Sequence, residues 1–505
     1  MGSSKWSRLI RGYATGRKLA VTCRGLTISR DELYKYTNGT FLTNATNAVH
    51  RRYLKFDLNE LCSIASRTGT TSAVTEVEKI EGGFSKALLL KKLDGTEVVA
   101  KLPFKIAGPA HYTTASEVAV LQYISQHTKV PVPKVLAWSS DPTNTVGAEY
   151  IIMEKAPGMQ LVKVFGNMRD YDHVLLIKNL CALESELAAI KFPANGSLYL
   201  RESLQNSSDA NVPLDSTEDP EGQFCVGPSC DRAWNEEGSR RESECSRAEQ
   251  IATLRLAWEV VTRMCADSLP GKFASPTLWH SDLHLGNIYV AEEDPTQIVS
   301  IIDWQGLPIL PMFCQVRFPE FLDLPESYEI GAPVPHRPDK LDEMQEDDRI
   351  LAEYTHKQVC MGKAYEAASG FKNKQVYKAR QLPSYFKDFF ERCGEISEEG
   401  VVPFRACLIE LSKVWEETGC AGKCPIQFTP EDLAKHERDF EEYSNFHRIR
   451  AIARKYLDTD SEGWIPPGTD VEVKRQQNQE LLQLVMKRSA EYGRTPENVR
   501  KIWPF

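Results

Sequence analysis

The sequence lacks three features that would each point to a different class of protein. Its 505 residues contain no uninterrupted run of about eighteen apolar residues, so we expect no membrane-spanning helix. Positive charge is not in excess, since 61 Lys and Arg stand against 70 Asp and Glu, and this argues against nucleic acid or an anionic membrane as the main partner. The 13 cysteines are dispersed, without a Cys/His cluster at zinc-ligand spacing, which favours a reducing compartment over a disulfide framework.

Acidic residues are absent from residues 1–30, which instead carry several Lys and Arg together with frequent Ser and Thr. Apolar residues recur at helical spacing between Trp6 and Tyr13. This composition is typical of a mitochondrial presequence, and the segment from Arg11 to Ala14 resembles a matrix-peptidase cleavage site. We therefore predict a presequence over residues 1–30 and a mitochondrial location. The alternative is a disordered basic tail, with a cytoplasmic location as the second choice.

A polar motif in the middle of the chain predicts a phosphoryl-transfer centre. The motif reads His280-Ser281-Asp282-Leu283-His284-Leu285-Gly286-Asn287, followed by Ile301-Ile302-Asp303-Trp304. In kinase-like sites an Asp accepts the proton of the attacking hydroxyl, a later Asn holds a metal ion, and a second Asp holds the metal against the phosphates. We therefore assign the proton-accepting role to Asp282 and Mg²⁺ binding to Asn287 and Asp303. We expect His280 and His284 to be structural.

The residues between the two parts of this motif favour a hairpin that brings Asn287 and Asp303 together. Residues 288–290 and 298–302 are β-branched and aromatic, and the polar turn 292–295 separates them. Without the hairpin, a helix cap and ordinary loop carboxylates would explain the motif about as well. With the hairpin we favour the catalytic interpretation.

Residues 72–158 carry the pattern of a nucleotide-binding lobe. Three antiparallel strands are expected, at residues 73–80, 87–90 and 97–101. Gly82 and Gly83 lie in the turn between the first two strands, where backbone N–H groups can approach a phosphate closely. A plain hairpin turn is the alternative for this glycine pair.

Lys101 ends the third of these strands, and Glu117 lies one turn into a helix expected over residues 113–126. A lysine held by such a glutamate reaches the α- and β-phosphates of ATP. Taken alone, Lys101 would be a solvated strand end, and Glu117 a first-turn carboxylate favoured by the helix dipole. Together with the downstream motif, the pair predicts a phosphate-binding lysine and its partner.

These motifs resemble those of the aminoglycoside phosphotransferase and choline-kinase-like family, whose hallmark is H-x-D-x-x-x-x-N followed by I-D-W or I-D-F. Asp303-Trp304-Gln305 stands where protein kinases have D-F-G, which indicates the small-molecule branch. The segment from Val130 to Val135 is also similar to a V-P-V-P-x-V segment of the family.

The resemblance implies a two-lobed, protein-kinase-like α+β fold. It has a small antiparallel β lobe, a large and mainly helical lobe and, here, a C-terminal helical extension. The resemblance also implies ATP and Mg²⁺ as cofactors. It further implies a hinge at which the main chain of Glu154 and Ala156 recognises the adenine edge, with Met153 lining the pocket. An ordinary core strand ending in a turn is the alternative for this segment.

The rest of the chain divides by composition and periodicity. Residues 31–71 are expected to form an N-terminal helical extension, and residues 159–330 the catalytic lobe. A polar insertion at about 201–250 interrupts that lobe, and we interpret it as a partly ordered cap near the acceptor site. Residues 331–505 show helical spacing, interrupted by a linker at 464–468. Length, basic N-terminus and helical tail together resemble a fungal subgroup of the family, the altered-inheritance-of-mitochondria proteins.

The motifs predict an ATP-dependent phosphotransferase acting on a small-molecule hydroxyl or amine acceptor, whose identity the sequence does not give. The alternative is a mitochondrial nucleotide-binding or scaffold protein with little catalysis. A protein kinase is disfavoured, because D-F-G, A-P-E and an activation loop between Asp303 and residue 330 are missing. Acidic runs such as Glu346 to Asp348 read as solvated faces, with an acidic cleft for a cationic acceptor as the alternative.

Overall fold

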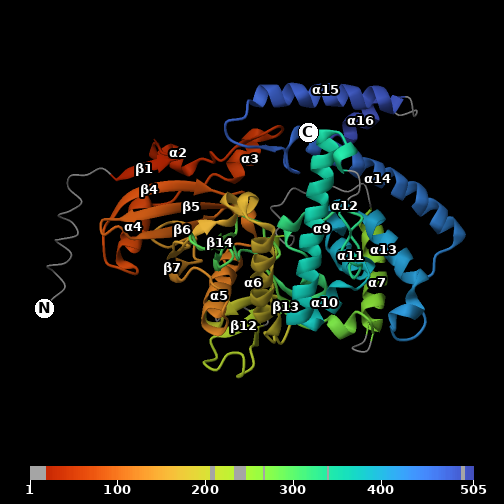
Figure 1. The fold of residues 1–505 in the computed structure, drawn as a ribbon, viewed down its shortest axis with the longest axis horizontal. Coiled ribbons are helices and arrows are strands. Elements are labelled where there is room, and N and C mark those ends of the chain that lie inside the picture. Colours follow the sequence, from red (N-terminus) through yellow and green to blue (C-terminus); the bar gives the residue numbers. More distant parts are fainter. Residues whose placement is uncertain (1–18, 205–210, 233–245, 265–267, 338–340, 491–494) are drawn as a thin grey trace.

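The computed structural model describes residues 19–204, 211–232, 246–264, 268–337, 341–490 and 495–505. Most of the predicted presequence therefore lies outside the described residues. The chain folds into a strand-rich lobe, at the left in Figure 1, and a larger helical part at the right. The two-lobed α+β fold predicted from the sequence is confirmed.

A seven-stranded sheet in the order β2-β1-β4-β5-β6-β8-β7 forms the small lobe. Its neighbours run antiparallel, apart from β1 and β4, which run parallel. The strands are β1 (Ala20–Cys23), β2 (Leu26–Thr27), β4 (Val74–Glu81), β5 (Ser85–Lys92), β6 (Glu97–Pro103), β7 (Val135–Ser139) and β8 (Tyr150–Glu154). Strands β4, β5 and β6 are the three antiparallel strands that the sequence predicts.

Helices cover both faces of this sheet, because successive side chains of a strand point to opposite faces. In β8, Ile151 and Met153 belong to the apolar cluster that includes α5 (Tyr112–His127). Ile152 lies between them in the strand and belongs instead to the cluster that includes α4 (Leu58–Arg67). The sheet is therefore held from both sides, and α5 lies beside the strand that carries the predicted phosphate-binding lysine.

The segment before β4 differs from the expected helical extension over residues 31–71. It contains the short helices α2 (Arg30–Tyr34) and α3 (Ala45–Arg51) and the strand β3 (Thr40–Phe41) in addition to α4. Strands β1 and β2 also lie inside the segment predicted as a presequence, residues 1–30. The side chain of Val21 in β1 is buried in the core of the small lobe. A cleavable leader compatible with this sheet must therefore end before β1.

The catalytic motif lies on a second, smaller sheet in the order β15-β14-β9. Its strands are β9 (Met159–Gln160), β14 (Ile288–Val290) and β15 (Ile298–Ile301). The predicted hairpin is confirmed, since Ile288 pairs with Ile301 in an antiparallel register. This pairing brings the residue before β14 next to the residue after β15. Helix α6 (Asp170–Ala189) packs against α9 (Glu346–Lys372) in the same lobe.

The described part of the insertion at about 201–250 contains a small sheet, and its residues Asp231 and Arg232 line a cleft that Asp282 also lines, so a cap near the acceptor site stays a prediction. The insertion's strands β11 (Val212–Pro213) and β12 (Phe224–Gly227) form a three-stranded sheet with β10 (Ser197–Leu200). Tyr199 and Cys225 of this sheet pack against Ala115 of α5. Apolar residues in strands explain this packing, because they must be buried. Residues 205–210 and 233–245 of the insertion lie outside the described residues.

The C-terminal region is helical, as the sequence predicts, but the segment that was expected to be a linker contains a strand. The remaining elements are α7 (Arg247–Arg263), β13 (Pro276–Leu278), β16 (Ile309–Pro311), α8 (Met312–Gln315), α10 (Lys374–Arg380), α11 (Ser384–Gly394), α12 (Ile396–Glu399), α13 (Val401–Lys413), α14 (Pro430–Leu457), β17 (Trp464–Ile465), α15 (Val471–Ala490) and α16 (Pro496–Ile502). The expected linker at 464–468 contains β17, which pairs antiparallel with β3. In Figure 1 the segment before α15 accordingly returns to the red N-terminal part beside α3.

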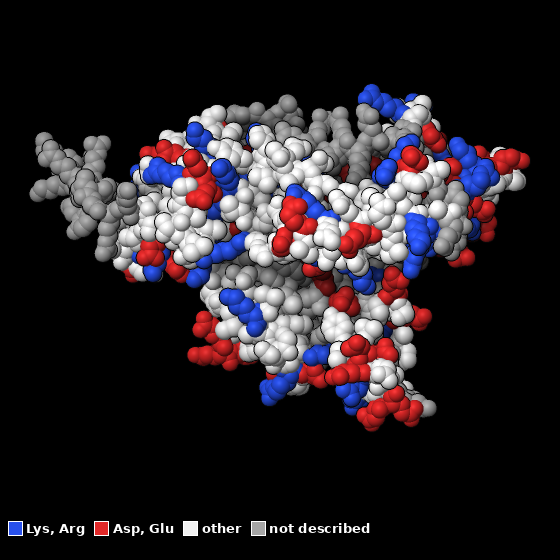
Figure 2. All heavy atoms as spheres, turned by 90° about the horizontal axis from the view of Figure 1, so that it is seen from above, with Lys and Arg blue, Asp and Glu red and all other residues white. Residues whose placement is uncertain are grey.

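The face of the molecule seen from above carries mixed charge (Figure 2). Figure 2 shows the molecule from above, with Lys and Arg interspersed among Asp and Glu over this face. Within the described ranges, no helix combines the length and the apolar character that crossing a bilayer requires.

Candidate active site

The catalytic loop between β13 and β14 is anchored from beneath by His280. The imidazole Nε2 donates a hydrogen bond to the carbonyl of Ile302 at 2.9 Å, and the ring packs edge-on against Trp304. Burial lowers the pKa of His280, so the ring is neutral and its proton lies on Nε2, where the carbonyl requires a donor. His280 thus ties the loop to the residue that precedes Asp303.

Asn287 closes the loop from the other end. Its side-chain amide donates to the backbone carbonyl of Asp282 at 2.9 Å, and its own backbone carbonyl accepts from the N–H of Ile302 at 3.0 Å. Gln160 of β9 supports the same turn, since its amide donates to the carbonyl of Gly286 at 3.0 Å. These bonds fix the main chain on which the carboxylate of Asp282 stands, and Asp282 itself is exposed toward a cleft.

Lys101 joins the two lobes by contacting two carboxylates at once. Its Nζ lies 2.7 Å from Oε1 of Glu117 and 2.6 Å from Oδ1 of Asp303. Burial raises the pKa of Glu117, and the ammonium of Lys101 opposes that rise. Burial would also raise the pKa of Asp303, but Lys101 outweighs it, so this pKa is lowered. Residues 101, 117 and 303, which are separated in the sequence, thus form one ion-paired cluster.

Asp303 adopts an uncommon backbone conformation. Its φ is +66°, in the left-handed region that non-glycine residues rarely enter. The neighbouring residues hold it there, since Ile302 is bonded through both its N–H and its carbonyl and the indole of Trp304 donates to Ile301 at 2.9 Å. Such strain is common at active sites, where the surrounding structure enforces it.

The glycine turn lies between β4 and β5. The N–H of Gly82 donates to the carbonyl of Ser85 at 3.0 Å, and the Ser85 hydroxyl donates to Oε1 of Gln305 at 2.9 Å. A methyl group added at Gly83 would meet no atom within 4 Å. The structure therefore leaves open space beside this turn, as the close approach of an anion requires. Neither Gly82 nor Gly83 has a positive φ, so backbone strain does not require glycine at these two positions.

Glu154 and Ala156 lie apart from the catalytic cluster. Glu154 ends β8, pairs with Val98 of β6, and uses its N–H to bond the carbonyl of Lys134 at 2.9 Å. Among the described residues, the lining of the main cleft includes Asp282 and Asp303 but neither Glu154 nor Ala156. A place for adenine at this strand end stays a prediction.

The main cleft has a volume of about 690 Å³ and opens between the lobes. The catalytic loop and the turn after Asp303 form its floor, and Phe84 of the glycine turn forms one edge. Arg51, Ile106 and Ala107 line it from the N-terminal part of the chain, and the C-terminal region and the insertion supply the remaining walls. Their residues there are Asp231, Arg232, Gly394, Glu395, Glu398, Asp460, Ser461 and Glu462.

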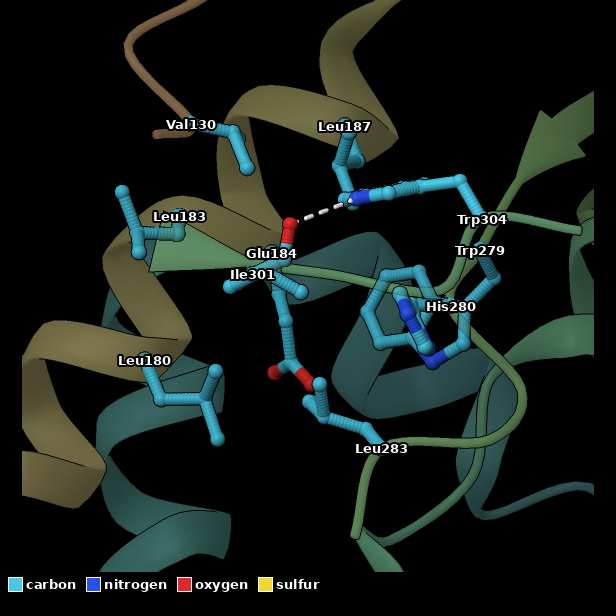
Figure 3. A pocket seen from close by; sticks show the side chains of 10 residues that line it. All are labelled: Val130, Leu180, Leu183, Glu184, Leu187, Trp279, His280, Leu283, Ile301 and Trp304. Carbon is cyan, nitrogen blue, oxygen red and sulfur yellow. Dashed lines mark hydrogen bonds between the residues drawn. The ribbon is translucent and has the colours of Figure 1, made fainter. Parts of the chain in front are cut away.

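A much smaller cavity of about 10 Å³ lies behind the catalytic loop (Figure 3). It has room for at most a single water molecule, so it is not a substrate site. Glu184 of α6 is among the residues that line it, and its carboxylate extends toward Leu283 (Figure 3). Burial raises the pKa of Glu184 to about 7, against the opposing hydrogen bond from the hydroxyl of Tyr365 at 2.6 Å.

The donor set suits a magnesium–phosphate site better than a self-contained metal site. Across the described residues, no group of three or more His, Cys, Asp and Glu could hold a metal ion. Asn287 and Asp303 offer an amide oxygen and carboxylate oxygens, and Mg²⁺ typically takes one or two protein ligands together with substrate phosphates. The chemistry of these side chains therefore fits Mg²⁺ arriving with a nucleotide.

Sequence reasoning missed several residues of the site. Ser85 lies two residues after Gly83, and Gln305 belongs to the motif Asp303-Trp304-Gln305 but was given no role, so both positions were a usable signal. Glu462 and Arg232, in contrast, come from segments without a local pattern, and the cleft wall formed by the C-terminal region was not foreseen.

The part of the chain that contains the site is similar to a known protein family. Residues 76–314 match the phosphotransferase enzyme family. The subtelomeric hrmA-associated cluster protein of Aspergillus fumigatus is 28% identical over 84% of this chain and 95% of its own length. The mitochondrial protein named altered inheritance of mitochondria protein 9 of Saccharomyces cerevisiae is 21% identical over 83% of this chain and 76% of its own.

Solved structures are more distant. The GDP complex of aminoglycoside 2'-phosphotransferase-IIIa is 16% identical, covers 68% of this chain and 93% of its own, and has a TM-score of 0.32. The amicoumacin kinase hAmiN, in complex with AMP-PNP, Ca²⁺ and Ami, is 12% identical, covers 79% of this chain and 96% of its own, and has a TM-score of 0.33. The match over residues 76–314, with the catalytic motif near their C-terminal end, identifies this part of the chain as a domain of the phosphotransferase enzyme family.

Proposed function

We propose that the protein is an ATP- and Mg²⁺-dependent phosphotransferase that acts on a hydroxyl or amine group of a small molecule. The observation that carries the proposal is the contact of Lys101 with both Glu117 and Asp303, beside a cleft into which Asp282 is exposed. Kinase-like phosphate binding needs a Lys–Glu ion pair and a metal-binding Asp beside it, and this cluster supplies all three groups.

Each residue has a distinct role in this proposal. Asp282 accepts the proton of the acceptor group and orients that group toward the terminal phosphate. Lys101 exchanges its contact with Asp303 for phosphate oxygens, while Glu117 keeps its ammonium in place. Asn287 and Asp303 would hold Mg²⁺, which neutralises charge on the phosphates when bound. The protein then contributes mainly positioning and electrostatic stabilisation.

The cleft favours a small acceptor that carries positive charge. Its volume of about 690 Å³ falls within the range of small-molecule sites, roughly 300 to 1,000 Å³. Carboxylates outnumber guanidinium groups on its lining. The acidic residues are Asp231, Asp282, Asp303, Glu395, Glu398, Asp460 and Glu462, and the basic residues are Arg51 and Arg232.

A mitochondrial location is part of the proposal. It is supported by the basic, acid-free composition of the first residues and by the mitochondrial relatives of this chain. The leader must end before β1, because that strand is part of the small-lobe sheet. Fusion of residues 1–18 to a fluorescent protein tests this, and a cytosolic fusion would refute it.

The experiment that tests the activity uses the purified protein with Mg-ATP and a metabolite library. We expect the Asp282→Asn variant to lose turnover by about 10²- to 10⁴-fold, the usual contribution of a proton-accepting side chain, while its affinity for mant-ATP stays within about twofold of the parent. Asp347→Asn, at an exposed position in α9, is the matched control and should change neither quantity.

The outcome separates this proposal from its main rival, a nucleotide-binding scaffold protein. Nucleotide binding without turnover of any acceptor would favour the scaffold. Turnover that persists unchanged in the Asp282→Asn variant would refute the role of that carboxylate, and failure of the parent protein to bind mant-ATP would refute both functions.

A further inference from the structure

Arg52 directly follows helix α3 and is almost completely buried, with 2% of its surface exposed. Its guanidinium packs against the rings of Tyr36 and Phe41, at 5.5 and 4.9 Å from their centroids. All three of its nitrogens have partners. Nε donates to the carbonyl of Gly83 at 3.0 Å, Nη1 donates to the carbonyl of Ala48 at 3.1 Å, and Nη2 pairs with the carboxylate of Glu462.

The bond to Gly83 adds a side-chain contact to the backbone bonds of the glycine turn, in which the N–H of Gly82 donates to Ser85 and the carbonyl of Phe84 accepts from Phe104. Gly82, Gly83 and Phe84 are all exposed. A backbone that must be ordered when a ligand binds costs conformational entropy at that moment. A guanidinium that fixes the Gly83 carbonyl beforehand reduces this cost and keeps the N–H groups of the turn directed at one place.

Glu462 can hold Arg52 because its own segment is fixed. The carboxylate of Asp460 accepts from the N–H groups of Glu462 and Trp464 at 2.8 and 2.9 Å. The indole of Trp464 donates to the carbonyl of Asn38 at 2.8 Å. Strand β17 then pairs with β3, so the turn that carries Glu462 is fastened to the N-terminal part of the chain.

Neither partner of this ion pair lies in the part of the chain that matches the family, residues 76–314. Arg52 precedes that part and Glu462 follows it, so the two extensions meet at the glycine turn. Glu462 is also 38% exposed and lines the main cleft together with Asp282. The contact therefore reaches from the proposed acceptor side of the cleft to the proposed phosphate side.

We propose that Arg52 is a positioning residue for the glycine turn, and that its pairing with Glu462 makes phosphate affinity depend on the C-terminal segment 460–465. The proposal rests on the proposed function, since it assigns the nucleotide phosphates to this turn. Arg52 does not touch the nucleotide. It acts through the carbonyl of Gly83, and Glu462 acts through Arg52.

The test compares mant-ATP, with Mg²⁺, against mant-adenosine in fluorescence titrations of the full chain. For Glu462→Gln we expect the Kd of mant-ATP to rise about tenfold, because a charge-assisted bond to Arg52 becomes a neutral one. Mant-adenosine has no phosphates, so its Kd should stay unchanged. Arg52→Lys keeps the charge but cannot bond Gly83, Ala48 and Glu462 together, and we expect the same selective loss from it.

Glu472→Gln is the matched control, since Glu472 forms an exposed ion pair with Arg475 in the same C-terminal region. Thermal unfolding of each variant identifies a folding defect, and Arg52→Lys serves if Glu462→Gln does not fold. Equal losses for both ligands, or no loss for either, would overturn the positioning role while leaving the proposed function intact. A parent protein that binds mant-adenosine but not mant-ATP would overturn both.

Discussion

Replacing Lys101 by Met tests the central cluster through stability rather than activity. The variant keeps most of the aliphatic side chain and removes the ammonium from between Glu117 and Asp303. Asp303 is 41% exposed and can be solvated, whereas Glu117 is 3% exposed and is left as a buried carboxylate without its cation. The cost should therefore come mainly from Glu117.

The size and the pH dependence of this cost follow from burial. Removing one partner of a buried ion pair costs roughly 3 to 5 kcal/mol, and protonation of the orphaned carboxylate limits it, at about 1.4 kcal/mol for each unit of pKa. We expect about 3 kcal/mol at neutral pH. Because the pKa of Glu117 in the folded variant lies above its unfolded value, the deficit is full above the folded pKa. It shrinks as the pH falls through that pKa toward the ordinary value of 4.5.

The assay is urea unfolding followed by tryptophan fluorescence, at about pH 8 and about pH 5.5. Lys101→Met combined with Glu117→Gln should recover most of the loss at the higher pH, because no buried charge remains. Lys413→Met breaks the exposed pair with Glu410 and should cost less than about 1 kcal/mol. A Lys101→Met variant as stable as the parent at both pH values would refute the ion-paired cluster.

Two further predictions concern other buried features. Burial raises the pKa of Glu184 to about 7, above its ordinary value of 4.5, so its protonation stabilises the fold at low pH and this contribution is lost as the pH rises through 7. Glu184→Gln should remove up to about 3 kcal/mol of that pH dependence, and an unchanged slope of unfolding free energy against pH would contradict it. Gly39 has a φ of +115°, and an added Cβ would lie 2.3 Å from Nε1 of Trp464. Gly39→Ala should therefore destabilise the protein by more than about 1 kcal/mol in urea unfolding, whereas Gly394→Ala, which meets no atom within 4 Å, should not.

The pattern of apolar and polar residues within a segment was enough to predict those strands and turns whose structure depends mainly on neighbouring residues in the sequence. The alternation in β4 and β6 reflects strands that bury one face more deeply than the other, and the β-branched residues around the catalytic motif predicted the hairpin β14–β15. The interval from Lys101 to Glu117 is set by one strand, one connection and one helical turn. Their contact at 2.7 Å therefore follows from short-range geometry.

Contacts between distant segments left no such pattern. Strand β1 has only four residues, and it lies beside β4 because the sheet offers an edge for pairing, not because of its own composition. The stretch around it is basic and free of acidic residues, so the sequence predicted a leader there. The same holds for β17, where Trp464 and Ile465 read as a linker because the strand is two residues long. Arg52 and Glu462 are separated by 410 positions, and nothing near either residue indicates the other.

The pairing of β3 with β17 also has a consequence for synthesis of the protein. The small lobe leaves the ribosome early, yet the arginine behind its glycine turn has no carboxylate partner until translation has passed residue 462. Nascent chains, and products cut short before that point, would then carry a loosely held turn. Under the proposed function, competence to take up nucleotide would thus be among the last properties that a growing polypeptide acquires.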